Sequence, residues 1–380
     1  MRILYVFRSL AHWGGIERIL VDKMNYLATM FGYEVYMLTT DQGCHLVPYQ
    51  LASEVHLEDL GINFHHQYRY GYLKRLLIAR QKESLFEKLL SDRLKTIKPS
   101  VIICTTANYV DINIIVKLKG HTPLIVESHS ICRMTLGRKG VLNRYADYMY
   151  RKGLSKAQVI VALTENDAGE WRKMFTKVCV IPDVVHLNEG DVSSLENKRV
   201  IWVGRFDYQK RPLEAIRIWE QIYPKFTDWH LDIYGEGELQ QDLEMASQSL
   251  GMNIHIHQPT ERIFEAYRKS SVLISTSLFE PFGLVIPEAM SCGLPVVAYD
   301  CPYGPASIIA DGRSGYLVTN NDREAYAKKL GYLLEDTMLR SQQGKYGLLI
   351  SYRFSAASIM PLWNSLIITL KSDEENLETN

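Results

Sequence analysis

The feature that most constrains this chain of 380 residues is an alternation of short β-rich apolar runs and amphipathic helical stretches that occurs twice. The first series begins at Arg2–Phe7 and the second at Arg199–Val203, and residues 182–197 between them are polar and without periodicity. Apolar strands that alternate with helices are typical of parallel sheets covered by helices. Because the chain is also too long for one ordinary core, we predict two successive α/β domains with a cleft between them and a linker at 182–197.

The same alternation gives the expected elements. In the first half we expect strands at residues 2–7, 35–40, 54–57, 62–64, 101–104, 124–127, 157–162 and 178–181, and helices at 16–30, 68–98 and 110–118. In the second half we expect strands at 199–203, 230–234, 253–257 and 272–275, and helices at 212–223, 239–250 and 261–269. Open parallel sheets bind ligands outside the carboxyl ends of their strands, so residues just after these runs are the candidates for a site.

Composition excludes several classes of protein. Hydrophobic residues make up 47% and charged residues 23%, as in soluble globular proteins. No run approaches the roughly 20 apolar residues of a membrane span, and the apolar start is too short for a signal peptide, so we expect a cytoplasmic protein. The six cysteines include no Cys-x-x-Cys pair, which predicts reduced thiols and no zinc site.

The net charge of zero hides an asymmetry. Residues 1–183 hold 25 Lys and Arg against 17 Asp and Glu, a net of +8, and residues 184–380 hold 18 against 26, a net of −8. Two interpretations stay open: chance together with an acidic tail, or an N-terminal half that faces an anionic membrane. The basic region 68–98 has the same two interpretations, since its mixture of tyrosines, cations and an apolar face suits a solvated helix or an interfacial one.

The segment Glu280–Glu288 carries the strongest chemical signal. Its two carboxylates bracket a Pro-Phe-Gly turn, and we expect a helix to begin near Phe282. A helix N-terminus favours a phosphate or a polyhydroxyl ligand, and flanking carboxylates can accept hydrogen bonds from sugar hydroxyls. The combination suits a ligand that is anionic in the middle and polyhydroxylated at both ends, such as a nucleotide sugar.

Three further loops follow predicted strands. Arg205 and Lys210 lie after the strand 199–203, where two cations can neutralise a diphosphate across the cleft from Glu280. Gly14-Gly15 follows the first strand and precedes a helix, which can present backbone to a phosphate but also suits a plain turn. His129 comes just past the strand 124–127, at the edge where ligands bind.

Other chemistries fit the residues poorly. The Tyr-Gly-Glu-Gly turn ending at Gly237 lacks the third glycine and the acidic residue of a nicotinamide site. Glu280, in a loop, and Glu288, in a helix, are a binding bracket and not the paired carboxylates of a glycosidase. His255 and His257 have a spacing compatible with a metal, but no third ligand and no Asp-x-Asp pair is evident, so we do not expect metal catalysis. Nucleophilic catalysis by Ser-His-Asp lacks its Gly-x-Ser-x-Gly.

With these residues assembled, the chain resembles the retaining glycosyltransferases of family 4 over nearly its whole length. The motifs that carry the resemblance are Gly14-Gly15-Ile-Glu-Arg18, His129, Ile181-Pro182-Asp-Val, Gly204-Arg205 to Lys210, Tyr234-Gly-Glu-Gly237, Glu280-x7-Glu288 and Gly315-Tyr-Leu-Val. The resemblance implies the GT-B fold, in which two Rossmann-like β/α/β domains face each other across a cleft. We therefore expect an acceptor-binding domain at 1–182, a donor-binding domain at 183–355, a helix at 356–371 that packs back on the first domain, and an acidic, disordered tail at 372–380.

The resemblance also implies roles for single residues. Arg205 and Lys210 would bind the donor diphosphate, Glu280 the donor-sugar hydroxyls and Glu288 the ribose. Contacts to the donor are further implied for the backbone at Phe282, Gly283 and Leu284, for Gly235, and for Gly14 and Gly15. His129 would sit at the sugar or the transfer site, which makes His129, Arg205, Lys210 and Glu280 the catalytic candidates. The base would lie against the 256–263 loop, which includes Ile263 and departs from the glycine usual there.

The implied activity is transfer of a hexose or N-acetylhexosamine from a nucleotide-diphosphate sugar, with a UDP-sugar favoured, to a lipid-linked or oligosaccharide acceptor in surface polysaccharide synthesis. Fixed cations and a helix N-terminus would stabilise the departing diphosphate, so no metal and no cofactor is expected. With no nucleophilic carboxylate evident beyond the sugar, front-face transfer is favoured and double displacement stays open. The partners are the donor, the acceptor and an anionic membrane beside the basic N-terminal domain, with no nucleic acid. The rival functions are a nucleotide-sugar epimerase on the same fold and a non-catalytic nucleotide-sugar-binding subunit.

Overall fold

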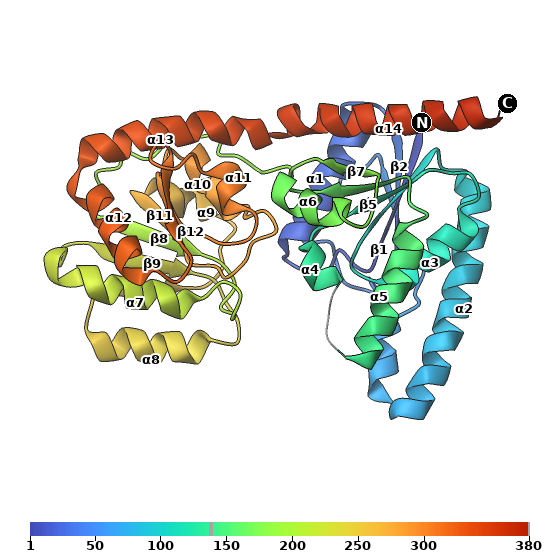
Figure 1. Ribbon diagram of the computed structural model, residues 1–380, viewed down its shortest axis with the longest axis horizontal. Helices are drawn as coiled ribbons and strands as arrows, with labels where there is room; N and C mark the ends of the chain where they lie inside the picture. Colours follow the sequence, from blue (N-terminus) through green and yellow to red (C-terminus); the bar gives the residue numbers. More distant parts are fainter. Residues whose placement is uncertain (137–139, 379–380) are drawn as a thin grey trace. The chain divides into compact units, whose positions relative to one another are not determined.

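The computed structural model describes residues 1–136 and 140–378 (Figure 1). The chain forms two compact units: the first contains residues 1–184 and the chain from Ile359 onward, and the second contains Val185–Ser358. The boundary after Val184 lies inside the predicted linker 182–197.

The first unit is built on a sheet of seven parallel strands in the order β3-β2-β1-β4-β5-β6-β7. Its strands are β1 Arg2–Phe7, β2 Glu34–Thr39, β3 Val55–Asp59, β4 Val101–Thr105, β5 Leu124–Glu127, β6 Val159–Ala162 and β7 Val178–Val180. Its helices are α1 Gly15–Thr29, η1 Phe64–Arg69, α2 Tyr72–Ile97, α3 Tyr109–Leu118, α4 Cys132–Thr135, α5 Val141–Leu154, α6 Glu165–Arg172 and, from Ile359 on, α14 Ala356–Glu378.

Strand β1 shows why both faces of this sheet are covered. Successive side chains of a strand point to opposite faces. Leu4 and Val6 join the core that α2, α3, α5 and α6 close with residues such as Trp171, which is fully buried. Tyr5 points the other way, with its ring 5.9 Å from Lys23 Nζ on α1. Each such buried aromatic or aliphatic side chain stabilises the fold by roughly 1.5–3 kcal/mol.

The second unit is built on a sheet of six parallel strands in the order β10-β9-β8-β11-β12-β13. Its strands are β8 Arg199–Val203, β9 His230–Tyr234, β10 Ile254–His257, β11 Val272–Ser275, β12 Val296–Asp300 and β13 Gly315–Thr319. Its helices are α7 Pro212–Ile222, η2 Tyr223–Lys225, α8 Gln240–Leu250, α9 Ile263–Arg268, α10 Val285–Ser291, α11 Pro305–Ile308, α12 Arg323–Glu335, α13 Thr337–Ser351 and η3 Tyr352–Phe354. Trp202 of β8 and Trp219 of α7 are the largest fully buried side chains of its core.

Three predicted elements are wrong in detail. Residues 62–64 form no strand, because Asn63 takes a left-handed φ of 54° and Phe64 starts η1. The basic helix predicted at 68–98 begins at Tyr72, after η1. The last helix, predicted to end at 371, continues to Glu378 because residues 372–378 contain no glycine or proline to stop it; residues 379–380 of the predicted tail lie outside the described residues.

The cysteines and the hydropathy of the helices were also considered in the sequence. All six cysteines lie in the described part of the chain, and none forms a disulfide there. Within residues 1–136 and 140–378, no helix is both long enough and apolar enough to cross a membrane.

Candidate functional site

The strand order of the second unit defines one place where its loops diverge. β8 pairs with β9 on one side and with β11 on the other, so the chain order reverses between β8 and β11. In open parallel sheets ligands bind in the crevice at such a switch point. Lys210 follows β8 and Glu280 follows β11, so both predicted site residues lie at this point.

Lys210 and Glu280 contact each other directly. Lys210 Nζ donates to Glu280 Oε1 at 2.5 Å, and the Ser277 hydroxyl donates to the same oxygen at 2.6 Å. The lysine side chain is 17% exposed and the glutamate side chain 4%. The expectation that Lys210 lies across a cleft from Glu280 is therefore wrong, because the switch point brings the two loops together within one unit.

The contacts leave capacity for a ligand on both side chains. An ammonium group has three donors, and Glu280 takes one from Lys210. Both contacts to Glu280 fall on Oε1, and Oε2 accepts no hydrogen bond from the described residues. The pair can therefore offer N–H donors to a phosphate and an acceptor oxygen to a hydroxyl.

Thr276 holds the loops after β8 and β11 together. Its hydroxyl accepts from Trp202 Nε1 at 2.9 Å and lies 3.0 Å from the carbonyl oxygen of Lys210. Trp202 is on β8 and buried, so the hydroxyl ties the Lys210 loop to the core. A buried polar bridge of this kind fixes the position from which Lys210 reaches Glu280.

The backbone of Glu280 is also fixed. Its N–H donates to the Pro302 carbonyl at 2.7 Å, and its own carbonyl accepts from the N–H groups of Tyr303 and Gly304 at 2.8 Å. A Cβ at Gly304 would come 1.8 Å from the Phe282 carbonyl oxygen, so only glycine allows this close approach. Glu280 is thus held by its backbone as well as by its side chain.

The turn after Glu280 buries its aromatic ring. Phe282 is 2% exposed and packs edge-on against Phe354 with ring centroids 5.2 Å apart, so its side chain belongs to the core. Gly283 has a φ of +102°, which favours glycine, and Leu284 is the N-cap of α10. The helix begins at Val285 and not near Phe282 as predicted, because the turn at Gly283 is not helical.

Glu288 lies in the first turn of α10 with a partner of its own. The Tyr267 hydroxyl donates to Glu288 Oε2 at 3.3 Å, and Tyr267 lies on α9, the helix that begins at the predicted donor residue Ile263. Glu280 and Glu288 therefore have different hydrogen-bond partners.

Two glycines allow the loops after β8 and β9 to touch. A Cβ at Gly235 would come 1.9 Å from the Gly204 carbonyl oxygen, and one at Gly237 would come 2.6 Å from that of Phe206. The loops are joined by hydrogen bonds from Gly204 N to the Tyr234 carbonyl and from Phe206 N to the Glu236 carbonyl, at 3.1 and 2.7 Å. Gly235 thus shapes the loop that carries Arg205.

Arg205 stands apart from the Lys210–Glu280 pair. Its side chain is 68% exposed, and its Nη2 lies 2.9 Å from Asp207 Oδ2 and 3.2 Å from Gln209 Oε1. These are contacts within its own loop. The structure leaves Arg205 as an exposed cation beside the switch point.

In the first unit, the predicted glycines precede α1. Gly14 is the N-cap and Gly15 the first residue of the helix. A Cβ at Gly14 would come 2.1 Å from Glu17 Oε2, so the Glu17 carboxylate occupies the space over the glycine. Burial raises the pKa of Glu17, and the opposing contributions of its backbone N–H, His12 and His129 do not cancel this. An anion approaching this helix N-terminus meets Glu17 first, which the sequence analysis did not foresee.

His129 lies at the end of β5, as predicted, inside a buried charge cluster that we define as Lys23, Glu127, His129 and Asp183. Lys23 Nζ donates to Glu127 Oε1 at 2.6 Å, His129 Nε2 lies 2.9 Å from Glu127 Oε2, and His129 Nδ1 lies 3.5 Å from Asp183 Oδ1. All four side chains are at most 7% exposed. Trp363 of α14 covers the cluster, with its ring centroid 3.3 Å from Lys23 Nζ.

The cluster sets the charge of the histidine. Burial opposes the imidazolium, but Asp183 and Glu127 outweigh it and raise the pKa of His129 to about 9. Burial likewise raises the pKa of Glu127, yet Lys23 and His129 together hold it below its ordinary value. Lys23 faces one carboxylate closely, so burial lowers its pKa. His129 is therefore a cation at neutral pH and cannot serve there as a general base.

The sequence analysis missed Lys23, Glu127, Asp183 and Trp363 as partners of His129. One signal was available, because Lys23 lies among Leu20, Met24 and Leu27 on the apolar face of α1. A charge on such a face requires a buried partner. The identity of that partner depends on the pairing of strands and was not available from the pattern.

The histidines considered as metal ligands pair elsewhere. His255 Nε2 lies 3.0 Å from His230 Nδ1, and His257 Nε2 lies 2.9 Å from Asp232 Oδ1. Among the residues that the structure describes, no group of three or more His, Cys, Asp or Glu side chains is placed to hold a metal ion.

Two family profiles match this chain. The profile described as "Glycosyl transferases group 1" matches residues 189–349, and the profile "Glycosyltransferase Family 4" matches residues 13–189. The chain is 24% identical over 372 residues to an uncharacterized glycosyltransferase of Haemophilus influenzae, covering 96% of this chain and 99% of that protein.

Two further comparisons also extend over the full length. The chain is 26% identical over 378 residues to the GalNAc-alpha-(1->4)-GalNAc-alpha-(1->3)-diNAcBac-PP-undecaprenol alpha-1,4-N-acetyl-D-galactosaminyltransferase of Campylobacter jejuni, covering 98% of this chain and 99% of that protein. The structure of Anabaena HepE in complex with UDP and glucose superposes with a TM-score of 0.74 at 18% identity, covering 97% of this chain and all of that one.

Two parallel-sheet α/β units whose site residues lie at strand ends define the GT-B class of glycosyltransferases. The two profiles together extend over residues 13–349, so the assignment rests on both units. The chain belongs to glycosyltransferase family 4, which confirms the resemblance found in the sequence.

Proposed function

We propose that the protein is a retaining, metal-independent glycosyltransferase that moves a hexose or N-acetylhexosamine from a nucleotide-diphosphate sugar, with a UDP-sugar favoured. The observation that carries this proposal is the Lys210–Glu280 pair at the switch point of the second unit, with Glu288 on the adjoining helix. Lys210 and Arg205 would bind the diphosphate, Glu280 the sugar hydroxyls through Oε2, and Glu288 the ribose. The UDP and glucose in the HepE complex support this class of donor.

The proposed chemistry is front-face transfer without a covalent intermediate. The bond from the sugar to the diphosphate breaks as the acceptor oxygen attacks from the same side, and the departing phosphate takes the acceptor proton. Charge develops on the diphosphate, so Lys210 and Arg205 stabilise the transition state more than the ground state. No step requires a metal or a cofactor. Gly14 and Gly15 would close over the diphosphate, with Glu17 displaced.

The proposed acceptor is a lipid-linked or other oligosaccharide in the synthesis of a surface polysaccharide, reached by a cytoplasmic protein bound peripherally to the inner face of the membrane. The name of the Campylobacter jejuni relative specifies an undecaprenol-linked substrate, which supports a lipid-linked acceptor. The excess of eight cations in residues 1–183 supports contact with anionic lipid.

Substitution at the pair tests the donor site. We expect Lys210→Ala to reduce transfer by about 10²-fold or more, because the diphosphate loses a fixed cation. Glu288→Ala should also abolish transfer by weakening donor binding. Transfer from UDP-glucose, UDP-galactose and their N-acetylated forms would be measured beside donor affinity by calorimetry.

A matched control is available on the same unit. Lys198 pairs with Asp228 in an exposed contact just before β8, at the opposite edge of the sheet from Lys210. Lys198→Ala should leave transfer and donor affinity unchanged. Full activity of a folded Lys210→Ala protein would contradict the site assignment.

A second measurement separates the rival functions. Donor incubated without acceptor should be recovered unchanged, since transfer requires an acceptor. An isomerised sugar would identify an epimerase, and donor binding without turnover on any lipid-linked or oligosaccharide acceptor would identify a binding subunit.

A further inference from the structure

The first half of helix α2 buries none of its side chains against the described residues. The helix runs from Tyr72 to Ile97, but its buried side chains, Phe86, Leu90 and Ile97, all lie in the second half. Residues 72–85 contribute no buried side chain, so these turns extend beyond the core (Figure 1). A helix end that packs on nothing is expected to be polar.

The N-terminal turns of α2 nevertheless expose large apolar side chains. We define the α2 tip as six exposed side chains from η1, from its C-cap residue and from the first turns of α2: Tyr68, Tyr70, Tyr72, Leu73, Leu76 and Leu77. Leu73 is 77% exposed, Tyr72 67% and Leu77 63%. Positions 72 and 76, and 73 and 77, are one turn apart, so these side chains form one continuous face. Contiguous apolar surface on a soluble protein marks an interaction site.

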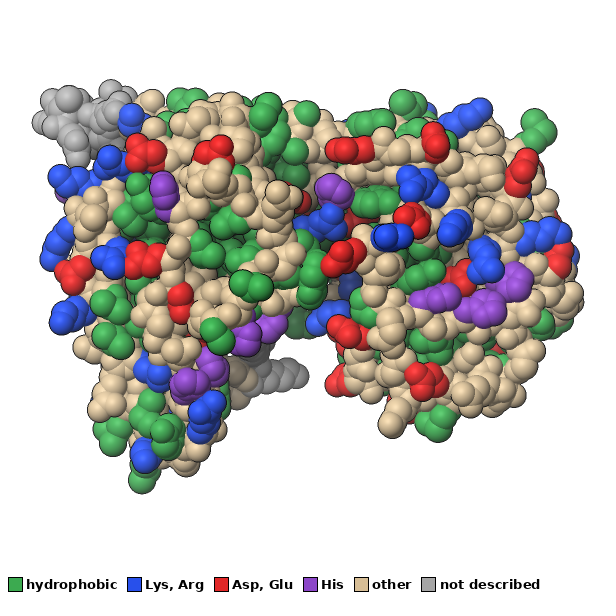
Figure 2. All heavy atoms as spheres, turned by 180° about the vertical axis from the view of Figure 1, so that it is seen from behind, with side chains coloured by type: hydrophobic (Ala, Val, Ile, Leu, Met, Phe, Trp, Pro, Cys, Tyr) green, Lys and Arg blue, Asp and Glu red, His purple; other side chains and the backbone are tan. Residues whose placement is uncertain are grey.

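The formal charges within the segment that carries the α2 tip are all positive. Residues 64–80 contain four cations, Arg69, Lys74, Arg75 and Arg80, and no Asp or Glu. Arg75 lies over the Tyr68 ring at 4.2 Å and Lys74 over the Tyr70 ring at 4.6 Å, so cations and aromatic rings are interleaved. Figure 2 shows hydrophobic and basic side chains gathered on the projection at the lower left, which the start of α2 forms.

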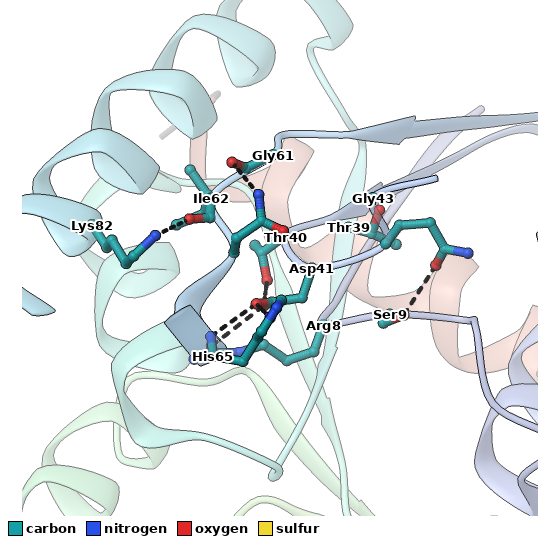
Figure 3. A network of polar contacts seen from close by, with 12 residues as sticks. Arg8, Ser9, Thr39, Thr40, Asp41, Gly43, Gly61, Ile62, His65 and Lys82 are labelled. Atoms are coloured by element: carbon teal, nitrogen blue, oxygen red, sulfur yellow. Dashed lines mark hydrogen bonds and ion pairs between the residues drawn. The ribbon is translucent and has the colours of Figure 1, made fainter. Parts of the chain in front are cut away.

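Contacts on either side of the α2 tip join it to the ends of β1 and β2. Asp41, just after β2, accepts from the backbone N–H of His65 at 3.2 Å and lies 2.9 Å from His65 Nδ1 (Figure 3). Arg8, just after β1, lies 3.6 Å from Asp41 and stacks over the Phe64 ring at 4.0 Å. Lys82 of α2 donates to the Ile62 carbonyl. These contacts fix η1 and α2 to the strand ends, so the apolar face exists before any partner binds.

We propose that the α2 tip is a docking surface for an anionic phospholipid membrane, with Leu73, Leu76 and Leu77 inserted at the level of the acyl-chain boundary, the tyrosines among the headgroups and the four cations on lipid phosphates. Tyrosine is favoured at membrane interfaces, and each nearby Lys or Arg strengthens binding to anionic lipid. The proposal rests on the proposed function only for its purpose, which is to bring the enzyme to a lipid-linked acceptor.

Vesicle flotation tests the proposal without any transfer assay. The full chain should float with vesicles of phosphatidylglycerol and phosphatidylcholine, should not float with phosphatidylcholine alone, and should be released by high salt. Lys74→Glu with Arg75→Glu should weaken binding by roughly tenfold or more, because two attractions become repulsions. Leu73→Ser with Leu77→Ser should weaken it by about tenfold or more and should make the residual binding more salt-sensitive, because only the charges remain.

Two matched variants serve as controls. Lys152→Glu with Lys156→Glu makes the same change of charge on exposed residues of the same unit, and Leu349→Ser with Tyr352→Ser removes exposed apolar side chains from the second unit. Both should float as the unchanged protein does. All variants should keep the same unfolding temperature and UDP affinity, which separates a failure here from a failure of the proposed donor site.

Two outcomes would overturn the proposal. Equal loss of flotation in Lys152→Glu with Lys156→Glu would mean that overall charge, and not the α2 tip, attracts the membrane. No flotation with anionic vesicles, together with a dimer in solution that Leu73→Ser with Leu77→Ser abolishes, would mean that a second copy of the chain covers this surface.

Discussion

At the level of single residues, His129 titrates under two opposing influences. Its folded-state pKa of about 9 exceeds the ordinary value near 6.5, so its contribution to stability is fully present below about pH 6.5 and is lost as the pH rises through about 9. We expect the free energy of unfolding of the first unit to fall by up to roughly 3 kcal/mol across that range. Denaturant titrations at pH 6.5 and pH 9.5 would measure it.

The control for this prediction is a side chain of similar size that does not titrate. In His129→Gln the fall between these two pH values should largely disappear, although the protein is less stable at pH 6.5. Asp183→Asn should move the fall to lower pH, since one of the two carboxylates that raise the pKa of His129 is gone. An unchanged pH dependence in His129→Gln would show that another group carries it.

Among the elements, the turn after Glu280 depends for its conformation on Gly304 more than on helix α10. A Cβ at Gly304 would meet the Phe282 carbonyl at 1.8 Å, and a backbone atom cannot move aside as a flexible side chain does. We expect Gly304→Ala to destabilise the second unit by about 1–3 kcal/mol or more and to weaken donor binding, because Glu280 and Phe282 must separate from it. Thermal unfolding and UDP calorimetry would measure the two effects.

Gly331, in the middle of α12, provides the contrast. The nearest atom to a Cβ there is 3.8 Å away on Phe226, which is ordinary contact. Gly331→Ala should stabilise the second unit by up to about 1 kcal/mol, since alanine favours the helix, and should leave donor binding unchanged. Similar losses in both variants would mean that any added methyl group disturbs this unit.

The elements also show what could be predicted from the sequence. Strands β8 and β11 were predicted with the bounds that the structure shows, because the buried centre of a parallel strand appears in the sequence as a continuous apolar run. The strand predicted at 62–64 is wrong because Ile62 and Phe64 are buried on either side of Asn63, which has a left-handed backbone conformation. Apolar alternation in the sequence cannot reveal such a conformation. The contact of Lys210 with Glu280 joins positions 70 residues apart and depends on strand order, so the site residues could be named but not assembled.

For the whole molecule, the path of the chain separates the two units. The sequence enters the second unit at Val185 and leaves it after Ser358, and everything before and after belongs to the first unit. Val185 N donates to the Phe354 carbonyl at 2.8 Å, so the entrance and the exit of the second unit lie side by side. Inserted domains with adjacent ends can fold alone.

We therefore predict that residues 185–358, produced alone, fold cooperatively and bind UDP. At a ligand concentration of 100 times the dissociation constant, UDP should stabilise this fragment by about 2.7 kcal/mol. Calorimetric unfolding with and without UDP would measure the shift, with the Lys210→Ala fragment as the control that should show less. A fragment that folds but ignores UDP would mean that the donor site needs the first unit.

The adjacent ends of the second unit have a consequence for how such proteins diversify. A segment whose two ends meet can be exchanged between relatives as a cassette without rethreading the rest of the chain. If the second unit binds the donor as proposed, replacing 185–358 by the equivalent segment of a relative should change which sugar is delivered while the α2 tip stays the same. On the two proposals together, donor choice and membrane binding are separable traits, and recombination can alter one while it keeps the other.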